Sequence, residues 1–312
     1  MILGASYSQL PLYEAARKLG AATVAASTPG DWPGFAVADE SVYADITNPE
    51  AILKAAQEKG IDGIATCCLD AGVRALGYTC EKMGLIGPSA RAADISNDKF
   101  KMKEAFMAGG VQCARHICIH SLEELEEALG KLEFPVVLKA VDLMGSRGIF
   151  RCNTREETFF YYNKTMEATR KDYCLVEEFI DGHEIEVAVL GNEEPTATFA
   201  GEIAPSQEFY TFEAKYVDGT SGLYIPAHIS EKAMQTVRED AVRVYRALGC
   251  KGLSRVDFFC TYAEDEIVFN EINTIPGFTS ISMYPKLQEH MGLAYADLID
   301  KLIGFAMERY DG

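Results

Sequence analysis

The chain has 312 residues, of which 29 are basic and 47 acidic, so its formal net charge is −18. This length accommodates two or three domains, each with a core of its own. No basic run interrupts the excess of acidic residues, so we predict that the protein binds neither nucleic acid nor an anionic membrane. Nine scattered cysteines without a CxxC pair, and no long apolar run, are typical of a reduced, soluble cytoplasmic protein.

The first part of the chain, residues 1–92, alternates short apolar strands with helices, an order that predicts a parallel, doubly wound sheet. Asn48 before Pro49 supplies a cap and a proline at the first helical position, which predicts a helix start. The turn at residues 4–8, GASYS, lacks the GxGxxG pattern and does not indicate a dinucleotide site. We expect strands at 1–3, 21–26 and 61–66, and helices at 10–19, 49–59 and 71–83.

A second region begins near residue 96 and mixes helices with strands. Ser121 with Glu124 and Thr154 with Glu157 are capping boxes that predict two helix starts. Glycines in the loop at 141–148 leave backbone N–H groups free to lie over a triphosphate, although such loops are as often plain turns. We expect helices at 99–108, near 230–247 and near 294–309, and strands at 134–139, 149–152 and 173–179, with mainly strands after residue 184.

The segment 252–285 carries the strongest chemical signal. Alternation along a strand places Arg255 and Asp257 on one face, and it places Glu271 and Asn273 on one face of the next strand. A hairpin between these strands would bring Asp257, Glu271 and Asn273 together, and three hard oxygen ligands suit Mg²⁺ holding a polyphosphate. The alternative is a solvated strand face, which the apolar neighbours of these residues disfavour.

Three blocks of sequence resemble the ATP-grasp superfamily, and within it the D-alanine–D-alanine ligases. They are VEEFIDGHEIEV (176–187), PSQEFYTFEAKY (205–216) and the segment 252–285, which continues through Pro276-Gly277 into a hydroxyl-rich turn. The N-terminal third is similar instead to the preATP-grasp domains of carbamoyl-phosphate-synthase-like and purine-pathway enzymes. The resemblance implies an α/β (α+β) ATP-grasp fold with a preATP-grasp domain at 1–92, an N-terminal lobe at 93–180 and a catalytic lobe at 181–312.

The same resemblance implies a nucleotide site for ATP, with Mg²⁺ as the cofactor, two ions being expected and Mn²⁺ the alternative metal. Lysines would contact the phosphates, an acidic and apolar hinge would hold the adenine, and one glutamate would accept the ribose hydroxyls. The implied nucleotide-binding residues are Lys99, Lys139, Ser146, Glu177, Phe179, Ile180, Glu184 and Lys215, and the implied metal ligands are Asp257, Glu271 and Asn273.

The resemblance also implies a carboxylate–amine ligase that forms an acyl phosphate and releases ADP and phosphate. Arg255 and the Gly277 N–H are expected to stabilise the oxyanion, and Lys215 and Tyr216 to lie on a closing flap. Ser282 would bind the carboxylate of the amine substrate, which favours an amino acid there. The partners are thus small molecules, a carboxylate and an amine, and pairing into a homodimer is expected by analogy.

The N-terminal turn departs from the D-alanine ligases, because it has no Glu-His pair to grip an ammonium group. The carboxylate substrate is therefore left open, with Ser6, Tyr7 and Gln9 as candidate contacts and helix capping by Ser8 as the alternative. Three other functions stay open as well. They are a D-alanine–D-alanine or D-alanyl–D-X ligase, a non-catalytic nucleotide-binding module, and a kinase-like enzyme that transfers phosphate to a hydroxyl.

Overall fold

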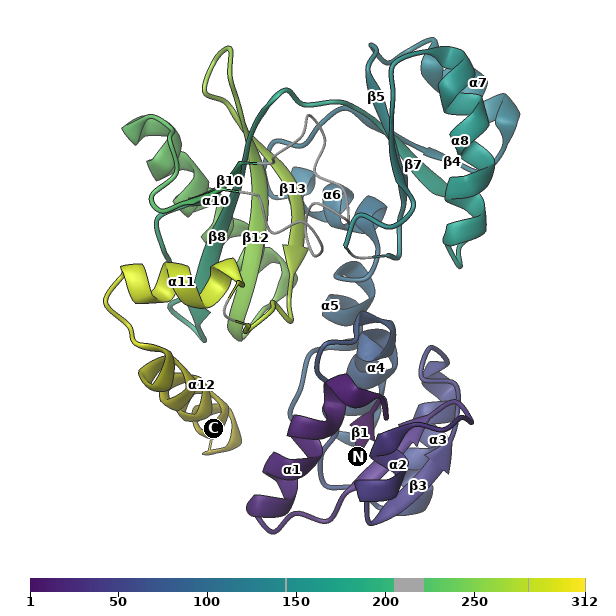
Figure 1. The fold of residues 1–312 in the computed structure, drawn as a ribbon, viewed down its shortest axis with the longest axis vertical. Helices are drawn as coiled ribbons and strands as arrows, with labels where there is room; N and C mark the ends of the chain where they lie inside the picture. Colours follow the sequence, from purple (N-terminus) through teal and green to yellow (C-terminus); the bar gives the residue numbers. More distant parts are fainter. Residues whose placement is uncertain (144, 205–221, 280, 312) are drawn as a thin grey trace. The chain divides into compact units, whose positions relative to one another are not determined.

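The computed structural model describes residues 1–143, 145–204, 222–279 and 281–311. The chain divides into two compact units (Figure 1). The first comprises 1–97, 249–251 and 306–312, and the second comprises 98–248 and 252–305. Within the described residues, no helix has the length and apolar character needed to cross a membrane.

The first unit contains a three-stranded parallel sheet in the order β1-β2-β3, flanked by helices. Apolar side chains from α3 and α4, among them Ile52 and Leu76, pack with Leu3 and Ala26 of the sheet to form its core. The elements are β1 (Ile2–Leu3), η1 (Tyr7–Gln9), α1 (Leu10–Lys18), β2 (Val24–Ser27), α2 (Pro33–Val37), β3 (Glu40–Tyr43), α3 (Pro49–Lys59), η2 (Asp70–Gly72), α4 (Val73–Met83) and α5 (Ala90–Ile95).

Most of the predicted elements of this unit are confirmed, including the start of α3, where Asn48 Oδ1 accepts hydrogen bonds from the N–H groups of Glu50 and Ala51. The predicted strand at 61–66 is wrong. Only an isolated bridge between Ile2 and Ala65 forms there, because two backbone hydrogen bonds follow β1 before the chain turns away. The elements α2 and β3 were not expected, since five and four residues are too few to give a clear periodicity.

The second unit begins with a four-stranded antiparallel sheet in the order β4-β7-β5-β6. Helices α7 and α8 cover one of its faces (Figure 1), and their apolar residues pack with Val136, Leu138 and Val176. The predicted caps are confirmed: Ser121 accepts from Glu124 N–H and Thr154 from Glu157 N–H. The elements are α6 (Lys99–Ala108), β4 (His116–Ile119), α7 (Leu122–Leu129), β5 (Val136–Ala140), β6 (Ile149–Cys152), α8 (Arg155–Ala168) and β7 (Cys174–Glu178).

A six-stranded antiparallel sheet completes the second unit, with the order β11-β10-β8-β12-β13 and β9 paired to β8. Its centre is the pairing of β12 with β8 and of β12 with β13, the hairpin that the sequence predicted. Helices α10 and α11 pack against the sheet. The elements are β8 (Gly182–Gly191), β9 (Thr196–Ala197), β10 (Gly201–Ala204), β11 (Gly222–Tyr224), α10 (Glu231–Leu248), β12 (Gly252–Thr261), β13 (Ile267–Asn273), α11 (Met283–His290) and α12 (Tyr295–Asp311).

Candidate nucleotide and metal site

One face of the six-stranded sheet carries a row of three carboxylates. The register pairs Glu186 of β8 with Asp257 of β12, and Asp257 with Glu271 of β13. Residues directly opposite one another in antiparallel strands place their side chains on the same face. Arg255, two positions before Asp257, pairs with Asn273 in the same way. The predicted convergence of the hairpin residues is therefore what the structure contains, and Glu186 is an addition that the sequence had not indicated.

A β-bulge next to this row turns two consecutive residues of β13 toward the same space. Asp257 pairs with Glu271, but its neighbour Phe258 pairs with Phe269, so Asn270 is the extra residue. Bulges of this kind re-aim side chains beside functional sites. As a result, both Asn270 and Glu271 line a cavity of about 810 Å³.

This cavity lies entirely within the second unit and draws its walls from both of that unit's sheets. It is lined by seven of the predicted nucleotide-binding residues, which are Lys99, Lys139, Ser146, Glu177, Phe179, Ile180 and Glu184. Its size and its mixed apolar and charged lining suit a nucleotide. The eighth predicted residue, Lys215, and the flap residue Tyr216 lie outside the described residues.

Arg255 is bound tightly within the carboxylate row. Its Nε and Nη2 donate to the two oxygens of Asp257 at 2.8 and 2.7 Å, and its Nε lies 3.2 Å from Glu186 Oε2. Burial alone would lower the pKa of Arg255, but the charges of Asp257 and Glu186 outweigh this effect and raise it well above its usual value. The guanidinium is thus a permanent cation beside the candidate metal ligands.

The lysines of the cavity are also paired with carboxylates. Lys99 Nζ lies 3.2 Å from Glu271 Oε2 and donates to Leu143 O at 2.6 Å. Lys139 Nζ contacts Glu177 Oε1 and donates to Asn270 Oδ1 at 3.1 Å. Burial would raise the pKa of Glu177, yet neighbouring lysines lower it to about 2. Glu177, which the resemblance assigns to the adenine hinge, therefore directs its carboxylate toward cations.

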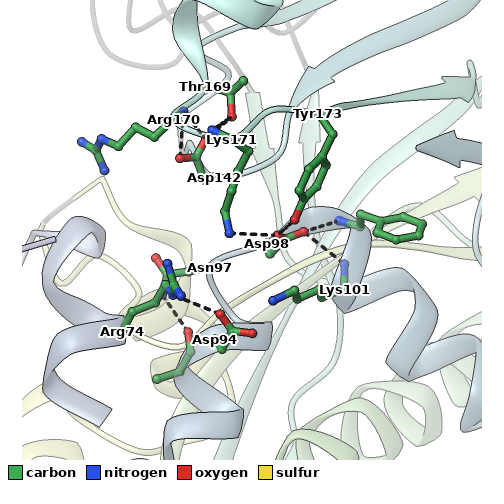
Figure 2. A network of polar contacts seen from close by, with 12 residues as sticks. Arg74, Asp94, Asn97, Asp98, Lys101, Asp142, Thr169, Arg170, Lys171 and Tyr173 are labelled. Atoms are coloured by element: carbon green, nitrogen blue, oxygen red, sulfur yellow. Dashed lines mark hydrogen bonds and ion pairs between the residues drawn. The ribbon is translucent and has the colours of Figure 1, made fainter. Parts of the chain in front are cut away.

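The position of Lys99 is fixed by a polar network at the start of α6 (Figure 2). Asp98, 1% exposed, caps the helix by accepting from the N–H groups of Phe100 and Lys101, and it also accepts from the Tyr173 hydroxyl. Lys171 Nζ lies 3.7 Å from the same carboxylate. The helix that carries Lys99 is consequently attached to the end of the four-stranded sheet.

A second carboxylate of this network anchors the loop that follows β5. Asp142 accepts from the Thr169 hydroxyl at 2.6 Å and from Arg170 N–H at 3.1 Å (Figure 2). The loop contains Ser146, whose φ of +60° lies in the left-handed region. Strain of that kind concentrates at ligand-binding loops, which supports the predicted place of the loop beside a triphosphate.

Gly277 and Ser282 lie in the turn between β13 and α11. Ser282 Oγ accepts from Thr279 N–H at 3.1 Å and lies 2.9 Å from Thr279 Oγ1. A Cβ on Gly277 would come within 2.7 Å of Ser282 Oγ, so a side chain there would displace the Ser282 hydroxyl. Neither residue is among those that line the 810 Å³ cavity.

In the first unit, two of the three candidate substrate contacts, Ser6 and Gln9, are hydrogen-bonded to each other. The Gln9 side-chain oxygen accepts from Ser6 N–H and Ser6 Oγ, and its amide donates to Cys67 O at 2.6 Å. Gln9 is 1% exposed, whereas Tyr7 is 79% exposed. The local helix start is thus organised by Ser6 and Gln9, not by Ser8 as the alternative had supposed.

Several residues of the site were missed by the sequence analysis. Lys103 lies one helical turn after Lys99, and Glu186 lies two residues after Glu184 on the same strand face, so periodicity alone could have indicated both. No sequence signal indicates Asn270, because it faces the cavity only through the bulge. The remaining missed residues that line the cavity include Arg151, His183, Glu202, Phe259 and Tyr262.

Asp257, Glu271 and Asn273 fit a hard divalent cation in chemistry and in placement, since they offer carboxylate and amide oxygens on one sheet face. Among the described residues, however, no three His, Cys, Asp or Glu side chains are arranged as a preassembled metal site. The predicted set contains only two residues of these types, and both are in ion pairs, Asp257 with Arg255 and Glu271 with Lys99. A cation would have to exchange with these partners.

An antiparallel sheet with a carboxylate row, facing a second antiparallel sheet across a lysine-lined cavity, is the architecture of an ATP-grasp protein. The model of the family described as "D-ala D-ala ligase C-terminus" matches residues 112–304. The chain therefore belongs to that family of ATP-grasp carboxylate–amine ligases, and the predicted superfamily and fold class are confirmed.

Individual relatives agree with this assignment. The chain is 40% identical over 235 residues to a D-alanine–D-alanine ligase of Bacillus cytotoxicus, covering 72% of this chain and 63% of the relative, and 41% identical over 239 residues to one of Clostridium acetobutylicum, covering 74% and 69%. It thus spans less than two thirds of the first relative's length.

Two solved structures are similar to this chain, one over most of its length and the other over nearly all of it. A D-Ala:D-Ser ligase from Enterococcus faecalis has a TM-score of 0.69 at 32% identity, covering 79% of this chain and 73% of the other. A phosphoribosylglycinamide synthetase from Anaerococcus prevotii has a TM-score of 0.62 at 30% identity and covers 97% of this chain and 76% of the other. The second similarity extends over nearly the whole chain, in keeping with the predicted likeness of the N-terminal third to purine-pathway enzymes.

Proposed function

We propose that the protein is an ATP- and Mg²⁺-dependent ligase of the D-alanine–D-alanine or D-alanyl–D-X type. The observation that carries the proposal is the row of Asp257 and Glu271 beside Arg255, at the edge of a cavity lined by Lys99 and Lys139. Relatives that match most of the chain are D-alanine–D-alanine ligases, which favours this reading over a ligase of unspecified substrates.

Different residues in and beside the cavity have different proposed roles. Lys99 and Lys139 bind the phosphates of ATP, while Phe179 and Ile180 pack against the base and Glu184 accepts from the ribose. Asp257, Glu271 and Asn273 hold the divalent cation. When bound, Mg²⁺ neutralises charge that develops on the β- and γ-phosphates.

The proposed reaction has two steps. A carboxylate oxygen of the first substrate attacks the γ-phosphorus, and the bond to the β-γ bridging oxygen breaks to release ADP. The free amine of the second substrate then attacks the acyl carbon, losing a proton as phosphate departs. Arg255 and the Gly277 N–H stabilise the oxyanion between these events, and donors of this type contribute about 3–4 kcal/mol.

Ser282 and the turn around it bind the carboxylate of the amine substrate, which is why an amino acid is proposed there. Retention of the metal ligands and Lys139 speaks against a non-catalytic nucleotide-binding module. A kinase-like transfer to a hydroxyl is disfavoured by the same turn, because it would need no site for a second carboxylate.

Two observations support a second candidate, a ligase whose carboxylate substrate is not D-alanine. The N-terminal turn has no acidic residue or histidine to grip the ammonium group of D-alanine, and Gln9 is committed to Ser6 and Cys67. The similarity to phosphoribosylglycinamide synthetase also includes this part of the chain. The amide-forming chemistry would be unchanged.

Phosphate release from ATP with Mg²⁺ tests the proposal, first with D-alanine alone and then with D-alanine paired with D-serine. L-amino acids and simple carboxylates, singly and in pairs, test the second candidate. Turnover with D-alanine alone and a D-alanyl dipeptide product would support the first proposal. Turnover only with another pair would replace it by the second, and the variant Asp257→Asn serves as the control with strongly lowered turnover.

A further inference from the structure

Behind the nucleotide cavity lies a buried lysine to which the proposed mechanism gives no part. Lys103 on α6 is 1% exposed, and its Nζ lies 2.9 Å from Glu177 Oε2. The other oxygen of Glu177 contacts Lys139, so one carboxylate lies between two ammonium groups. Lys139 and Glu177 line the cavity, whereas Lys103 is not among its lining residues.

The arrangement contains one more positive charge than the carboxylate needs. Glu177 is 3% exposed and Lys139 is 6% exposed, so neither charge is compensated by bulk water. Breaking a buried ion pair by removing one partner is strongly unfavourable, because the other charge stays buried without compensation. A buried carboxylate with two cations can give up one of them at much lower cost than a carboxylate with a single cation.

We propose that Lys103 is a positioning residue for nucleotide binding: it keeps Glu177 ionised and in place, so that Lys139 can leave Glu177 and bind a phosphate of ATP. Without Lys103, Lys139 would be the only described residue left in an ion pair with Glu177. Its movement to a phosphate would then leave the carboxylate unpaired, unless Glu177 took up a proton. This inference rests on the proposed binding of ATP.

The other groups around this cluster do not replace Lys103. His116 of β4 is opposite Glu177 in the register, but its Nε2 lies 3.4 Å from Glu104 Oε1, and the Arg151 guanidinium lies 4.2 Å from the centre of the Phe179 ring. Asn270, on β13, faces Lys139 and accepts a hydrogen bond from it, but it carries no charge. Cys113 lies within electrostatic range of both Lys103 and Glu177, and burial is the main cause that raises the pKa of its thiol to about 11. Glu104 acts on the same thiol and is acidic. Near neutral pH, Glu177 is thus the group expected to take up a proton when Lys103 is removed.

The test measures Mg²⁺–ATP binding by titration calorimetry, in buffers of different ionisation enthalpy, for the full chain and for Lys103→Met. The variant is expected to bind ATP at least about 30-fold more weakly at pH 7.5, the loss typical of truncating a buried charge pair. It should also take up close to one proton per ATP bound, and its deficit should shrink toward pH 5.5. A purely structural role for Lys103 would not move the proton uptake.

Two further variants act as controls. Lys103→Arg keeps the charge and is expected to restore most of the affinity without proton uptake. Lys101→Met removes a lysine from the same helix, at a position outside the cavity lining, and is expected to bind ATP as the wild type does. In steady state, the KM for ATP should rise in Lys103→Met, while the KM for the amine substrate stays unchanged.

Several outcomes would overturn the inference. Equal ATP affinity and equal proton uptake in the wild type and in folded Lys103→Met would show that Lys103 has no such role. If Lys103→Met does not fold, the comparison is between Glu177→Gln and the double variant with Lys103→Met. These two should bind ATP equally, and weaker binding by the double variant would mean that Lys103 acts by another route. Failure of the wild type to bind ATP is a different result, which overturns the proposed function itself.

Discussion

Replacing Arg255 by methionine should destabilise the protein strongly, because two buried carboxylates depend on it. Asp257 loses two hydrogen bonds of 2.8 and 2.7 Å, and Glu186 loses a cation at 3.2 Å. The two acids are 8% and 7% exposed, so water does not replace the guanidinium. Removing one member of such a cluster costs about 3–5 kcal/mol, and we expect a loss of this size in the free energy of unfolding at pH 7.

The pH dependence of this loss distinguishes an electrostatic cause from simple loss of packing. In Arg255→Met, two carboxylates lie buried side by side without their cation, and burial and mutual repulsion favour their neutral forms. Lowering the pH relieves this repulsion in the folded state, so the stability of the variant recovers as the pH falls. The difference from the wild type should therefore narrow between pH 7 and pH 5.

Urea unfolding at both pH values, followed by circular dichroism, gives the required free energies. Arg170→Met, at an exposed position, is the matched control and should change stability by no more than about 0.5 kcal/mol. The double variant with Glu186→Gln should recover part of the loss. A destabilisation of under about 1 kcal/mol at pH 7, or one of equal size at pH 5, would refute the assignment of Arg255 as the counter-ion of this row.

Three further predictions follow from the described contacts. Asp257→Asn should lower Mg²⁺-dependent turnover by a factor on the order of 100, with Mg²⁺ titration showing weaker metal activation; unchanged activation would exclude Asp257 as a ligand. The depressed pKa of Glu177, about 2 against a usual 4.5, should contribute stability that is complete above pH 4.5 and lost as the pH falls toward 2. Glu177→Gln should therefore show a shallower decline in unfolding free energy over that range, and parallel curves would contradict this. Asn48→Ala should cost about 1 kcal/mol in urea unfolding, because Asn48 caps α3, and a change near zero would argue against that cap.

The sequence predicted the hairpin of β12 and β13 because two apolar runs with alternating charged residues have a single satisfactory arrangement. Arg255, Asp257, Glu271 and Asn273 could be placed on one face from period-two alternation alone. Asn270 could not, since the bulge that turns it into the cavity depends on the pairing of Phe258 with Phe269.

Contacts between residues far apart in the chain were equally difficult to predict from the sequence. The ion pair of Lys99 with Glu271 and the hydrogen bond of Lys139 to Asn270 each join residues more than a hundred positions apart, and they form only in the folded unit, where α6 packs against β13 and Lys139 of β5 faces the cavity. The strand predicted at 61–66 failed for a related reason. Its apolar run is long enough for a strand, but only Ala65 pairs with β1, so tertiary geometry and not propensity decided the outcome.

Three cations of the site are already paired with carboxylates: Lys99 with Glu271, Lys139 with Glu177, and Arg255 with Asp257. If ATP and Mg²⁺ bind as proposed, the lysines turn to phosphates and the carboxylates of Asp257 and Glu271 turn to the metal. Lys99 and Glu271 then each gain a new partner, while Glu177 and Arg255 keep the second partner that each already has, so no buried charge is left alone when nucleotide and metal arrive together.

ATP without Mg²⁺, or Mg²⁺ without ATP, would break an ion pair and offer a new partner to only one of its two members. The geometry therefore favours joint binding of nucleotide and metal. Glu177 and Arg255 each have a second ion-pair partner in the structure. Glu177 keeps Lys103 when Lys139 leaves, and Arg255 keeps Glu186 when Asp257 leaves. Glu186 lies inside the block 176–187 that carries the resemblance, and Lys103 lies one helical turn after Lys99, so strand and helix periodicity could have indicated both.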